Sequence, residues 1–501
     1  MNYCIILNAL FNTEYAYRAF FDGSSAFSRA LALARNFGKD VYMVLRRDAE
    51  LPEGLPGDVR VVRADFSACG FADAVLEVFS DAGCDFVVLM FADSPFFSSK
   101  TAQEMIDQHV EFFADYSVAE GYPAGIVPEV LSLRAASAVR KLAEDFTEEL
   151  RRSLLFDIIK KDINSFDIET LVSEHDVRLL RPSFFADCKR NFLVCQAFMG
   201  FFSPDMDAER FAAVVLKNMG LLRSVPAYYQ IEVVRGCLQS CSYCPYPKFI
   251  DVLSTREFMP IERFSSIIEE IVSFSSDAVI GLSAFGELSL HPDVVKLLEI
   301  ALSHKELSVL VETSGYGWDV SVLEKISSLD GSDRIKWIVS LDTLNENLYS
   351  VIRGDGFSDV MACIDVLKRL FGDNVFLQAV RLRETEDYLE SFYRTLKEKQ
   401  YNVIIQQYDS FCAMLPDKMV VDISPVRRFP CWHISRDMVV MIDGTVPVCK
   451  ERFLTGPYAG NVFSDSLENI WKNIEKYWDM HLSENYPDYC LNCKEYFTFN
   501  F

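Results

Sequence analysis

The stretch Val233-Val-Arg-Gly-Cys-Leu-Gln-Ser-Cys-Ser-Tyr-Cys-Pro245 places Cys237, Cys241 and Cys244 directly after an apolar run that is typical of a strand. Three thiolates this close in the chain can converge on one inorganic centre. Zinc normally takes four protein ligands, and no fourth Cys or His stands nearby. Three cysteines around a 4Fe–4S cluster leave one iron free to bind another molecule. The spacing favours such a cluster over the alternatives, a zinc site or a purely structural group of cysteines.

The segments around and after this motif alternate between strand-like and helix-like patterns. Short apolar runs predict strands at 231–234, 278–282, 308–312, 337–341, 375–380 and 403–408. Strands that each lead into a helix predict an α/β fold, here a full or partial β/α barrel, whose functional groups gather at the C-terminal ends of the strands. We expect this barrel at residues 226–425.

The C-x3-C-x2-C spacing, with Tyr243 before the last cysteine, resembles the signature of the radical SAM superfamily. Three later segments match the family in chain order. SAFGEL resembles its Gly-Gly-Glu-Pro segment, VETSG its Thr-Asn-Gly strand end and IVSLDT its Val-Ser-Leu-Asp strand, which is followed by Arg353 and Gly354. Phe285 and Leu288 depart from the first of these segments, but a backbone carbonyl can still bind an ammonium group there.

This resemblance implies site residues and cofactors. The 4Fe–4S cluster that binds S-adenosylmethionine would be held by Cys237, Cys241 and Cys244. Residues that bind S-adenosylmethionine itself would be Gly286, Glu287, Thr313 and Ser340.

The resemblance also implies an enzyme, an oxidoreductase or modifying enzyme that cleaves S-adenosylmethionine reductively. The 5′-deoxyadenosyl radical then abstracts hydrogen from a substrate, here expected to be a peptide or protein, and flavodoxin or ferredoxin supplies electrons. Two alternatives stay open. One is radical modification of a nucleotide-linked sugar, and the other is a cytidylyltransferase-type nucleotidyltransferase whose cysteines are structural.

A second group of cysteines closes the chain. Twelve residues, Gly444 and four residues separate Cys431 from Cys449, and Cys490 and Cys493 follow. The stretch MVVMIDGTVPV predicts a hairpin that brings Cys449 back to Cys431. Four cysteines are a complete ligand set, and the pattern resembles a short SPASM domain with one auxiliary 4Fe–4S cluster, expected at 426–501. Structural zinc is the alternative, and His433 is expected to be structural.

The first 150 residues alternate strand-like and helix-like segments, and FADSPFF followed by GYPAGIVPEVLS resembles cytidylyltransferases of the glycosyltransferase-A-like (Rossmann-like) fold. The resemblance implies a divalent metal on Asp93. However, residues 8–18 contain no glycine to cradle a triphosphate, and Phe11, Tyr15 and Tyr17 would crowd it. We therefore expect a degenerate nucleotidyltransferase-like domain at 1–150 that binds substrate or partner. A connector is expected at 151–225, and this arrangement resembles the spiro-SPASM family over nearly the full chain.

Composition narrows the functional class. Lys and Arg number 49 against 73 for Asp and Glu, so the net charge is −24 and nucleic-acid binding is not expected. No apolar run approaches the ~20 residues of a membrane span, and the first residues lack a basic leader, so we expect a cytoplasmic protein with no membrane partner. Seven cysteines outside the motifs are expected to be small buried hydrophobic residues: Cys4, Cys69, Cys84, Cys188, Cys195, Cys363 and Cys412.

Overall fold

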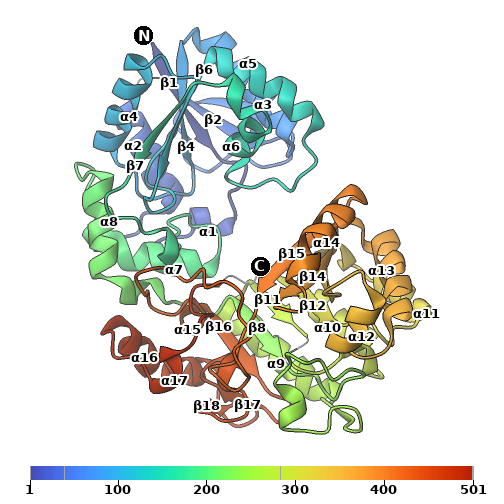
Figure 1. Cartoon of the computed structure of the whole chain (residues 1–501). Coiled ribbons are helices and arrows are strands. Elements are labelled where there is room, and N and C mark those ends of the chain that lie inside the picture. Colours follow the sequence, from blue (N-terminus) through green and yellow to red (C-terminus); the bar gives the residue numbers. More distant parts are fainter. Residues whose placement is uncertain (1, 39, 283, 499–501) are drawn as a thin grey trace. The chain divides into compact units, whose positions relative to one another are not determined.

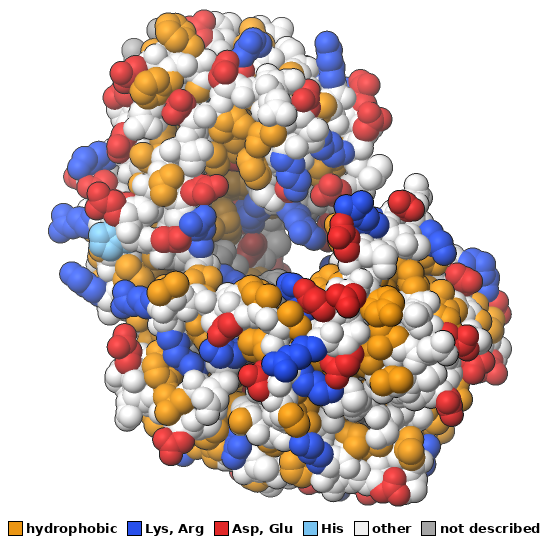
Figure 2. Space-filling model, viewed as in Figure 1, with side chains coloured by type: hydrophobic (Ala, Val, Ile, Leu, Met, Phe, Trp, Pro, Cys, Tyr) orange, Lys and Arg blue, Asp and Glu red, His pale blue; other side chains and the backbone are white. Residues whose placement is uncertain are grey.

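The computed structural model describes residues 2–38, 40–282 and 284–498 of the chain (Figure 1). The chain forms two compact units that divide between Ser224 and Val225. Within the described residues, no helix is both long and apolar enough to cross a membrane. On the face drawn in Figure 2, basic and acidic side chains are interspersed.

The first unit is built on a seven-stranded sheet in the order β3-β2-β1-β4-β6-β5-β7. Its strands are β1 (Tyr3–Asn8), β2 (Val41–Arg46), β3 (Arg60–Ala64), β4 (Phe86–Phe91), β5 (Tyr116–Glu120), β6 (Glu129–Ser132) and β7 (Ile168–Val172). β1 runs parallel to β2 and β4, and only β6 runs antiparallel to its neighbours among these strands. The central strands β1 and β4 are apolar almost throughout because helices cover both of their faces.

Two helices, α2 (Ala26–Phe37) and α4 (Ser99–Glu111), pack on one face of this sheet. The other face is covered by α3 (Ala68–Ala82), α5 (Leu133–Leu142) and α6 (Leu154–Ile159). Four of these helices, α2 to α5, begin at a serine whose hydroxyl accepts a hydrogen bond from the first turn, at Ser25, Ser67, Ser98 and Ser132.

The expected connector at 151–225 is folded into this first unit. Its strand β7 pairs with β5 as the edge of the sheet. Its helices α7 (Lys189–Phe198) and α8 (Ala208–Lys217) pack with α1 (Glu14–Tyr17) in an aromatic cluster. These contacts join residues that are far apart in the sequence, so the local pattern of 151–225 does not reveal them.

The second unit contains a parallel seven-stranded sheet in the order β15-β14-β13-β12-β11-β8-β16, a partial barrel. Its strands are β8 (Tyr228–Ile231), β11 (Ala278–Gly281), β12 (Leu307–Thr313), β13 (Ile335–Ser340), β14 (Val375–Arg381), β15 (Asn402–Gln407) and β16 (Asp437–Val440). The helices between strands β8 and β15 are α9 (Ile261–Ser275), α10 (Val294–Leu302), α11 (Val320–Ser327), α12 (Glu346–Ile352), α13 (Phe357–Phe371) and α14 (Glu386–Glu398). The first predicted strand lies earlier than expected, and it is followed by a short ribbon of β9 (Val234–Arg235) and β10 (Glu257–Phe258).

The C-terminal segment differs from the expected hairpin. The turn at Gly444 forms, with the Met441 N–H donating to the Thr445 carbonyl at 2.8 Å. However, β16 pairs in parallel with β8, whereas β17 (Thr445–Pro447) pairs with β18 (Tyr458–Asn461). The two strands join different sheets because the open edge of β8 accepts β16. The remaining helices are α15 (Trp432–Arg436), α16 (Leu467–Leu482) and α17 (Asp488–Leu491).

Candidate functional site

The loop that carries the first three cysteines leaves β9 through Gly236. This residue has a φ of +134°, and a Cβ atom on it would lie 2.1 Å from the Thr255 carbonyl oxygen. The next residue, Cys237, donates its N–H to the carbonyl of Val252 at 2.8 Å. Glycine is therefore required where the chain passes between β9 and the segment before β10, and this contact sets the direction in which the cysteine loop begins.

The three cysteines are half-buried. Burial is the main reason that the pKa of Cys237 and of Cys244 is raised to about 12, and the pKa of Cys241 is raised for the same reason. The charge of Cys241 also raises the pKa of Cys237 and of Cys244, whereas the guanidinium of Arg353 opposes the shift at all three thiols. Ligation by sulfur requires loss of these protons, so metal binding here would be coupled to proton release.

In the part of the chain that the structure describes, no three His, Cys, Asp or Glu side chains are grouped closely enough to hold a single metal ion. The donor set nevertheless fits a cluster of several irons, because each sulfur then binds a different iron. Three half-buried thiols in one loop, with the guanidinium of Arg353 to offset thiolate charge, satisfy this requirement.

Gly286 and Glu287 lie against the start of the cysteine loop. The N–H of Glu287 donates to the Gly236 carbonyl at 2.9 Å. A Cβ atom on Gly286 would lie 1.9 Å from the Val234 carbonyl oxygen, so no larger residue fits without a shift of the backbone. The segment after β11 is thereby fixed to the strand that leads into Cys237.

Glu287 is the centre of a buried polar group. Its carboxylate accepts hydrogen bonds from the hydroxyl of Thr313 at 2.6 Å and from the N–H and hydroxyl of Ser314 at 2.8 and 2.6 Å. Two of the predicted residues, Glu287 and Thr313, are thus in direct contact. Ser340 ends β13, next to the end of β12, which carries Thr313. Ser314 was not predicted, although its place beside Thr313 in VETSG was a signal.

A second polar network, also not predicted, holds the cysteine loop from the other side. Asp342 is buried, has a φ of +65°, and accepts hydrogen bonds from Tyr243 at 2.7 Å and Arg353 at 2.8 Å. Arg353 also donates to the side chain of Gln239 at 3.2 Å. Tyr243 and Gln239 flank Cys241, so the network fixes the loop on both sides of this cysteine.

The four C-terminal cysteines come from different elements but lie close enough for their charges to interact. Cys431 precedes α15, Cys449 follows β17, Cys490 lies in α17 and Cys493 follows it. Burial raises the pKa of Cys490 to about 12 and also raises the pKa of Cys431 and Cys449, and the charges of the four thiols act on one another.

His433 is a structural residue, as expected. Its Nδ1 atom lies 2.6 Å from a carboxylate oxygen of Asp437, and its Nε2 atom lies 3.1 Å from the hydroxyl of Thr498. Both ring nitrogens are therefore engaged by neighbours other than the cysteines.

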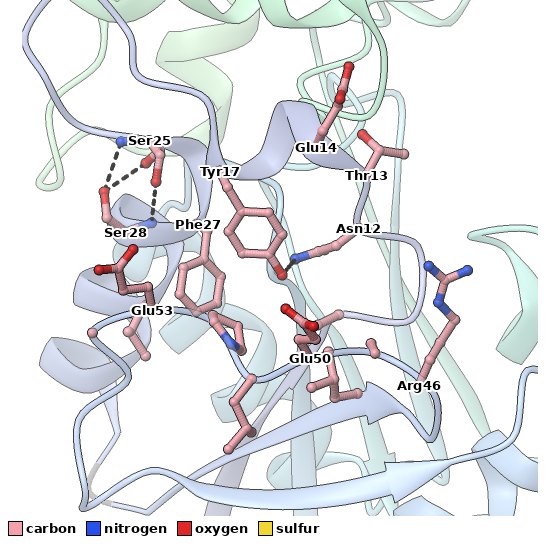
Figure 3. A pocket seen from close by; sticks show the side chains of 17 residues that line it. Asn12, Thr13, Glu14, Tyr17, Ser25, Phe27, Ser28, Arg46, Glu50 and Glu53 are labelled. Atoms are coloured by element: carbon pink, nitrogen blue, oxygen red, sulfur yellow. Dashed lines mark hydrogen bonds between the residues drawn. The ribbon is translucent and has the colours of Figure 1, made fainter. Parts of the chain in front are cut away.

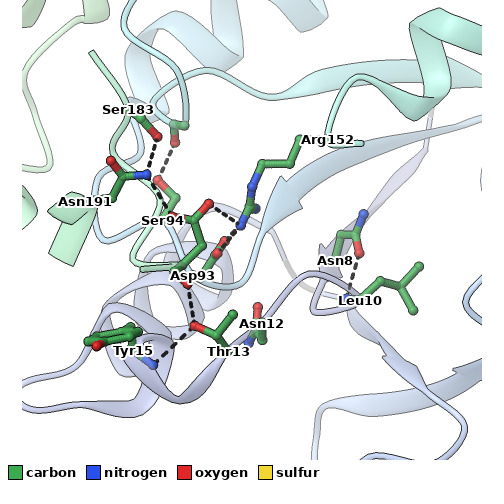
Figure 4. Close-up of polar contacts among 12 residues, drawn as sticks. Asn8, Leu10, Asn12, Thr13, Tyr15, Asp93, Ser94, Arg152, Ser183 and Asn191 are labelled. Atoms are coloured by element: carbon green, nitrogen blue, oxygen red, sulfur yellow. Dashed lines mark hydrogen bonds and ion pairs between the residues drawn. The ribbon is translucent and has the colours of Figure 1, made fainter. Parts of the chain in front are cut away.

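In the first unit, Asp93 is fully buried and its carboxylate is occupied by Arg152 (Figure 4). One guanidinium nitrogen donates to Asp93 at 2.9 Å, the other also contacts it, and this second nitrogen lies 3.2 Å from Asp187. Burial raises the pKa of Asp93, and the charge of Arg152 opposes that rise. The guanidinium lies 4.0 Å from the ring centroid of Phe185. Arg152 thus supplies the positive charge that a divalent metal would bring.

The first unit also has a cavity of about 820 Å³ at the C-terminal ends of β1 and β2 (Figure 3). Three carboxylates and one guanidinium are among its lining side chains, from Glu14, Glu50, Glu53 and Arg46. Tyr17 also lines the cavity and accepts a hydrogen bond from Asn12 at 3.1 Å.

The other two bulky residues of the glycine-free loop lie elsewhere. Tyr15 packs with Phe192 in the aromatic cluster, and Phe11 packs beneath Arg152. Of the three aromatic residues expected to crowd a triphosphate, only Tyr17 lines the cavity.

Comparison with protein families identifies the class of protein to which the chain belongs. Residues 231–396 match the radical SAM superfamily, 431–494 match the SPASM iron–sulfur cluster-binding domain and 17–158 match the MobA-like NTP transferase domain. The chain belongs to the radical SAM superfamily and carries a SPASM domain. An uncharacterised protein of Treponema pallidum is 38% identical over 362 residues, which cover 70% of this chain and 99% of that relative.

Solved structures resemble parts of the chain. BtrN in complex with AdoMet and 2-DOIA is 18% identical, with a TM-score of 0.39, over 54% of this chain and 94% of BtrN. Streptococcus suis SuiB bound to precursor peptide SuiA is 15% identical, with a TM-score of 0.42, over 53% of this chain and 68% of SuiB. A cytidylyltransferase from Leptospira borgpetersenii is 16% identical, with a TM-score of 0.37, over 44% of this chain and 97% of that enzyme. The family implies a 4Fe–4S cluster, S-adenosylmethionine and auxiliary iron–sulfur ligation by the SPASM domain.

Proposed function

We propose that the protein cleaves S-adenosylmethionine at a cluster held by Cys237, Cys241 and Cys244, and abstracts hydrogen from a peptide or protein. The observation that carries this proposal is the contact of the cysteine loop with the Glu287 group, made through the hydrogen bond from Glu287 to Gly236. Radical SAM chemistry needs the cluster and the binding groups for its cosubstrate side by side. This contact within one unit supports such an arrangement.

The residues of the site have separable roles. The thiols of Cys237, Cys241 and Cys244 would hold a 4Fe–4S cluster, which when bound would supply the electron for cleavage of S-adenosylmethionine. Glu287, held by Thr313 and Ser314, presents negative charge to the amino group of the cosubstrate. Asp342 and Arg353 position the loop through Tyr243 and Gln239.

We infer the peptide or protein substrate from the resemblance to SPASM proteins. The proposal also includes a cytoplasmic location and a flavodoxin or ferredoxin as the electron donor, because a low-potential cluster needs such a reductant. The C-terminal set of Cys431, Cys449, Cys490 and Cys493 would hold one auxiliary 4Fe–4S cluster.

The first unit, in this proposal, binds substrate or partner and does not transfer nucleotides. Its metal-binding carboxylate is already paired with Arg152, and its cavity has more carboxylates than cations. Both features oppose the binding of a nucleoside triphosphate with its metal.

The test is anaerobic reconstitution followed by measurement of 5′-deoxyadenosine. The wild type is expected to form it with dithionite, and alanine at Cys237, Cys241 or Cys244 is expected to abolish it. Cys69→Ala is the matched control, because Cys69 lies in α3 of the first unit. Undiminished 5′-deoxyadenosine in any of the three cysteine variants would contradict the mechanism.

The substrate class is tested separately. A peptide library is expected to raise 5′-deoxyadenosine formation above the level without substrate, and nucleotide sugars are not. Stimulation by a nucleotide sugar alone would contradict the peptide substrate while leaving cleavage of S-adenosylmethionine intact.

A further inference from the structure

The aromatic ring of Phe285 has a defined partner in the C-terminal segment. Phe285 stands where the radical SAM family has the first glycine of its Gly-Gly-Glu-Pro segment. Its ring stacks on the ring of Phe453, with the centroids 3.6 Å apart and an angle of 20° between the ring planes. Phe285 is half-buried, and Phe453 is 1% exposed. The departure from the family segment is therefore not an isolated change, because a second aromatic residue packs against it.

Phe453 belongs to the segment that carries one of the auxiliary cysteines. A short 3-10 turn (Lys450–Arg452) begins directly after Cys449, and Phe453 follows this turn. The N–H of Phe453 donates to the carbonyl of the first residue of the turn at 3.3 Å. Phe285, in contrast, lies just before Glu287. The stacked pair, Phe285 and Phe453, thus connects the segment expected to bind the cosubstrate with the C-terminal domain.

The stacked pair is part of an apolar cluster that includes two of the first three cysteines. The ring centroid of Tyr246 lies 5.6 Å from that of Phe285 and 6.0 Å from that of Phe453. Cys237 and Cys244 pack against the same cluster. The other buried members of the cluster are Val252, Val439 and Met441. The pair therefore belongs to the apolar surroundings of two thiols that are expected to bind iron.

A buried carboxylate ties the cysteine loop to the C-terminal segment beside this cluster. Glu232 is fully buried and accepts hydrogen bonds from the hydroxyl of Tyr246 and from the N–H of Ile442, the latter at 3.0 Å. Its own N–H donates to the carbonyl of Val440 at 2.8 Å. Tyr246 follows Cys244 in the cysteine loop, and Ile442 lies in the turn after β16. The two segments that meet at the stacked pair are therefore also joined by hydrogen bonds.

The exposure of the two rings indicates their role. An apolar shell around a metal site limits the access of solvent and thereby influences the reduction potential of an iron–sulfur cluster. Phe285 is half-buried, so it lies at the boundary between the apolar cluster and solvent. Because Phe453 is almost fully buried and stacks on Phe285, loss of either ring would remove part of the apolar cover of Cys237 and Cys244.

We propose that Phe285 and Phe453 form an apolar wall that keeps water away from Cys237 and Cys244, and that the C-terminal domain thereby completes the first cysteine site. The two phenylalanines are positioning residues, because they act through the surroundings of the thiols. The inference rests on the proposed function only for the identity of the group that these thiols bind. The wall itself is a property of the protein chain and can be tested without a cluster.

The first experiment measures how fast each thiol is alkylated. The apoprotein of the whole chain, kept reduced and free of oxygen, is treated with iodoacetamide at fixed pH, and peptide mass spectrometry follows each cysteine. Phe453→Ala is expected to raise the rates at Cys237 and Cys244 about tenfold, because water and reagent enter where the ring is missing. Phe285→Ala is expected to have the same effect. The double variant is expected to stay within about twofold of the single variants, because each change alone opens the same wall.

Two controls separate this effect from a general loss of structure. Phe463→Ala removes a ring of the C-terminal domain that packs elsewhere, with the guanidinium of Arg263 at 4.1 Å from its centroid, and is expected to leave both rates unchanged. Cys363 is buried in α13 and reports opening of the barrel. Its rate of alkylation is expected to equal that of the wild type in every variant.

The second experiment uses the reconstituted protein. S-adenosylmethionine is expected to change the electron paramagnetic resonance signal of the first cluster, because that cluster has an iron without a cysteine ligand. The reduction potential of this signal is expected to be more positive in Phe453→Ala than in the wild type, because water stabilises the negative charge that reduction adds. Phe463→Ala is expected to leave the potential unchanged.

Wild-type rates at Cys237 and Cys244 in both single variants would overturn the proposal, and so would an equal rise at Cys363. Effects that multiply in the double variant would overturn the pairing of the two rings. An unchanged reduction potential despite faster alkylation would overturn the role of the wall at the cluster. A failure of the proposed function would appear separately, as a wild-type protein that forms no 5′-deoxyadenosine while the alkylation results still hold.

Discussion

A buried carboxylate stands after a strand of the sheet in each unit, and the two differ in the charge of their partners. Asp93 in the first unit is paired with the guanidinium of Arg152. Glu287 in the second unit receives its hydrogen bonds from Thr313, Ser314 and other neutral groups, and among the described residues no Lys, Arg or His forms an ion pair with it. Neutral donors leave the negative charge of Glu287 available to a cationic ligand, whereas Arg152 cancels that of Asp93.

The difference shows how a cationic side chain of the protein itself can take the place of a bound cation at a buried carboxylate. The local sequence does not show which of the two carboxylates is neutralised, since each follows a strand and precedes a short turn. The partner that decides the outcome for Asp93 comes 59 residues later in the chain, from the start of the segment before α6. We expect the tertiary ion pair, together with the missing glycines, to prevent nucleotidyl transfer.

The largest expected effect is on stability, from Arg152→Ala. This change leaves the Asp93 carboxylate buried without its partner, so we expect a loss of ~3–5 kcal/mol in the free energy of unfolding. Arg151→Ala is the control, because Arg151 is exposed and only 3.8 Å from an equally exposed Glu149. Urea unfolding measures both variants, and equal stabilities would contradict the role given to Arg152.

The same variant predicts a pH dependence. Burial already raises the pKa of Asp93, and removal of Arg152 takes away the charge that opposes this rise. The folded variant then holds a proton that the unfolded chain releases, so its stability is expected to fall as the pH rises above about 4, the usual pKa of aspartate. A stability that instead increases through this range would show that Asp93 is charged in the variant.

Glu287→Gln is expected to affect ligand binding more than stability. The change keeps the size of the side chain but removes its charge, and a hydrogen bond to a charged group contributes ~1.5–3 kcal/mol, so binding of S-adenosylmethionine should weaken about 10- to 100-fold. Equilibrium dialysis of the reconstituted protein measures this. Glu299→Gln on the exposed side of α10 is the control and should bind normally.

Gly286→Ala tests how much the close contact between Gly286 and Val234 contributes to stability. The added Cβ atom would lie 1.9 Å from the Val234 carbonyl oxygen, so the backbone must shift, at a cost of ~1–3 kcal/mol. Gly57→Ala, where a Cβ atom meets nothing within 4 Å, is the control. If the unfolding curves of the two variants coincide, the contact of Gly286 with Val234 is not tight.

The smallest expected effect is the absence of nucleotidyltransferase activity in the wild type. The wild type is expected to release no pyrophosphate from CTP or other nucleoside triphosphates with sugar phosphates, because Arg152 occupies the metal-binding carboxylate. A pyrophosphate assay with Mg²⁺ checks this. Robust turnover that is lost in Asp93→Ala would contradict the comparison between the two carboxylates.

The sequence by itself determined the class of the protein. The family comparison confirms the resemblance read from the C-x3-C-x2-C motif and from the spacing of Cys431, Cys449, Cys490 and Cys493. The alternation of strands and helices also predicted the mostly parallel sheet of the first unit and the parallel sheet of the second, because hydrophobic periodicity is a local property. The ligand roles of the seven motif cysteines and of Gly286, Glu287, Thr313 and Ser340 are predictions still to be tested.

Only the tertiary structure decided which distant residues meet. It joined β7 to the first sheet, placed β16 beside β8 and paired Asp93 with Arg152. None of these contacts has a local signal in the sequence, because each depends on which sheet edge is open or which buried charge lacks a partner. Sequence spacing identifies groups that act within one loop, whereas packing selects the partners that come from elsewhere in the chain.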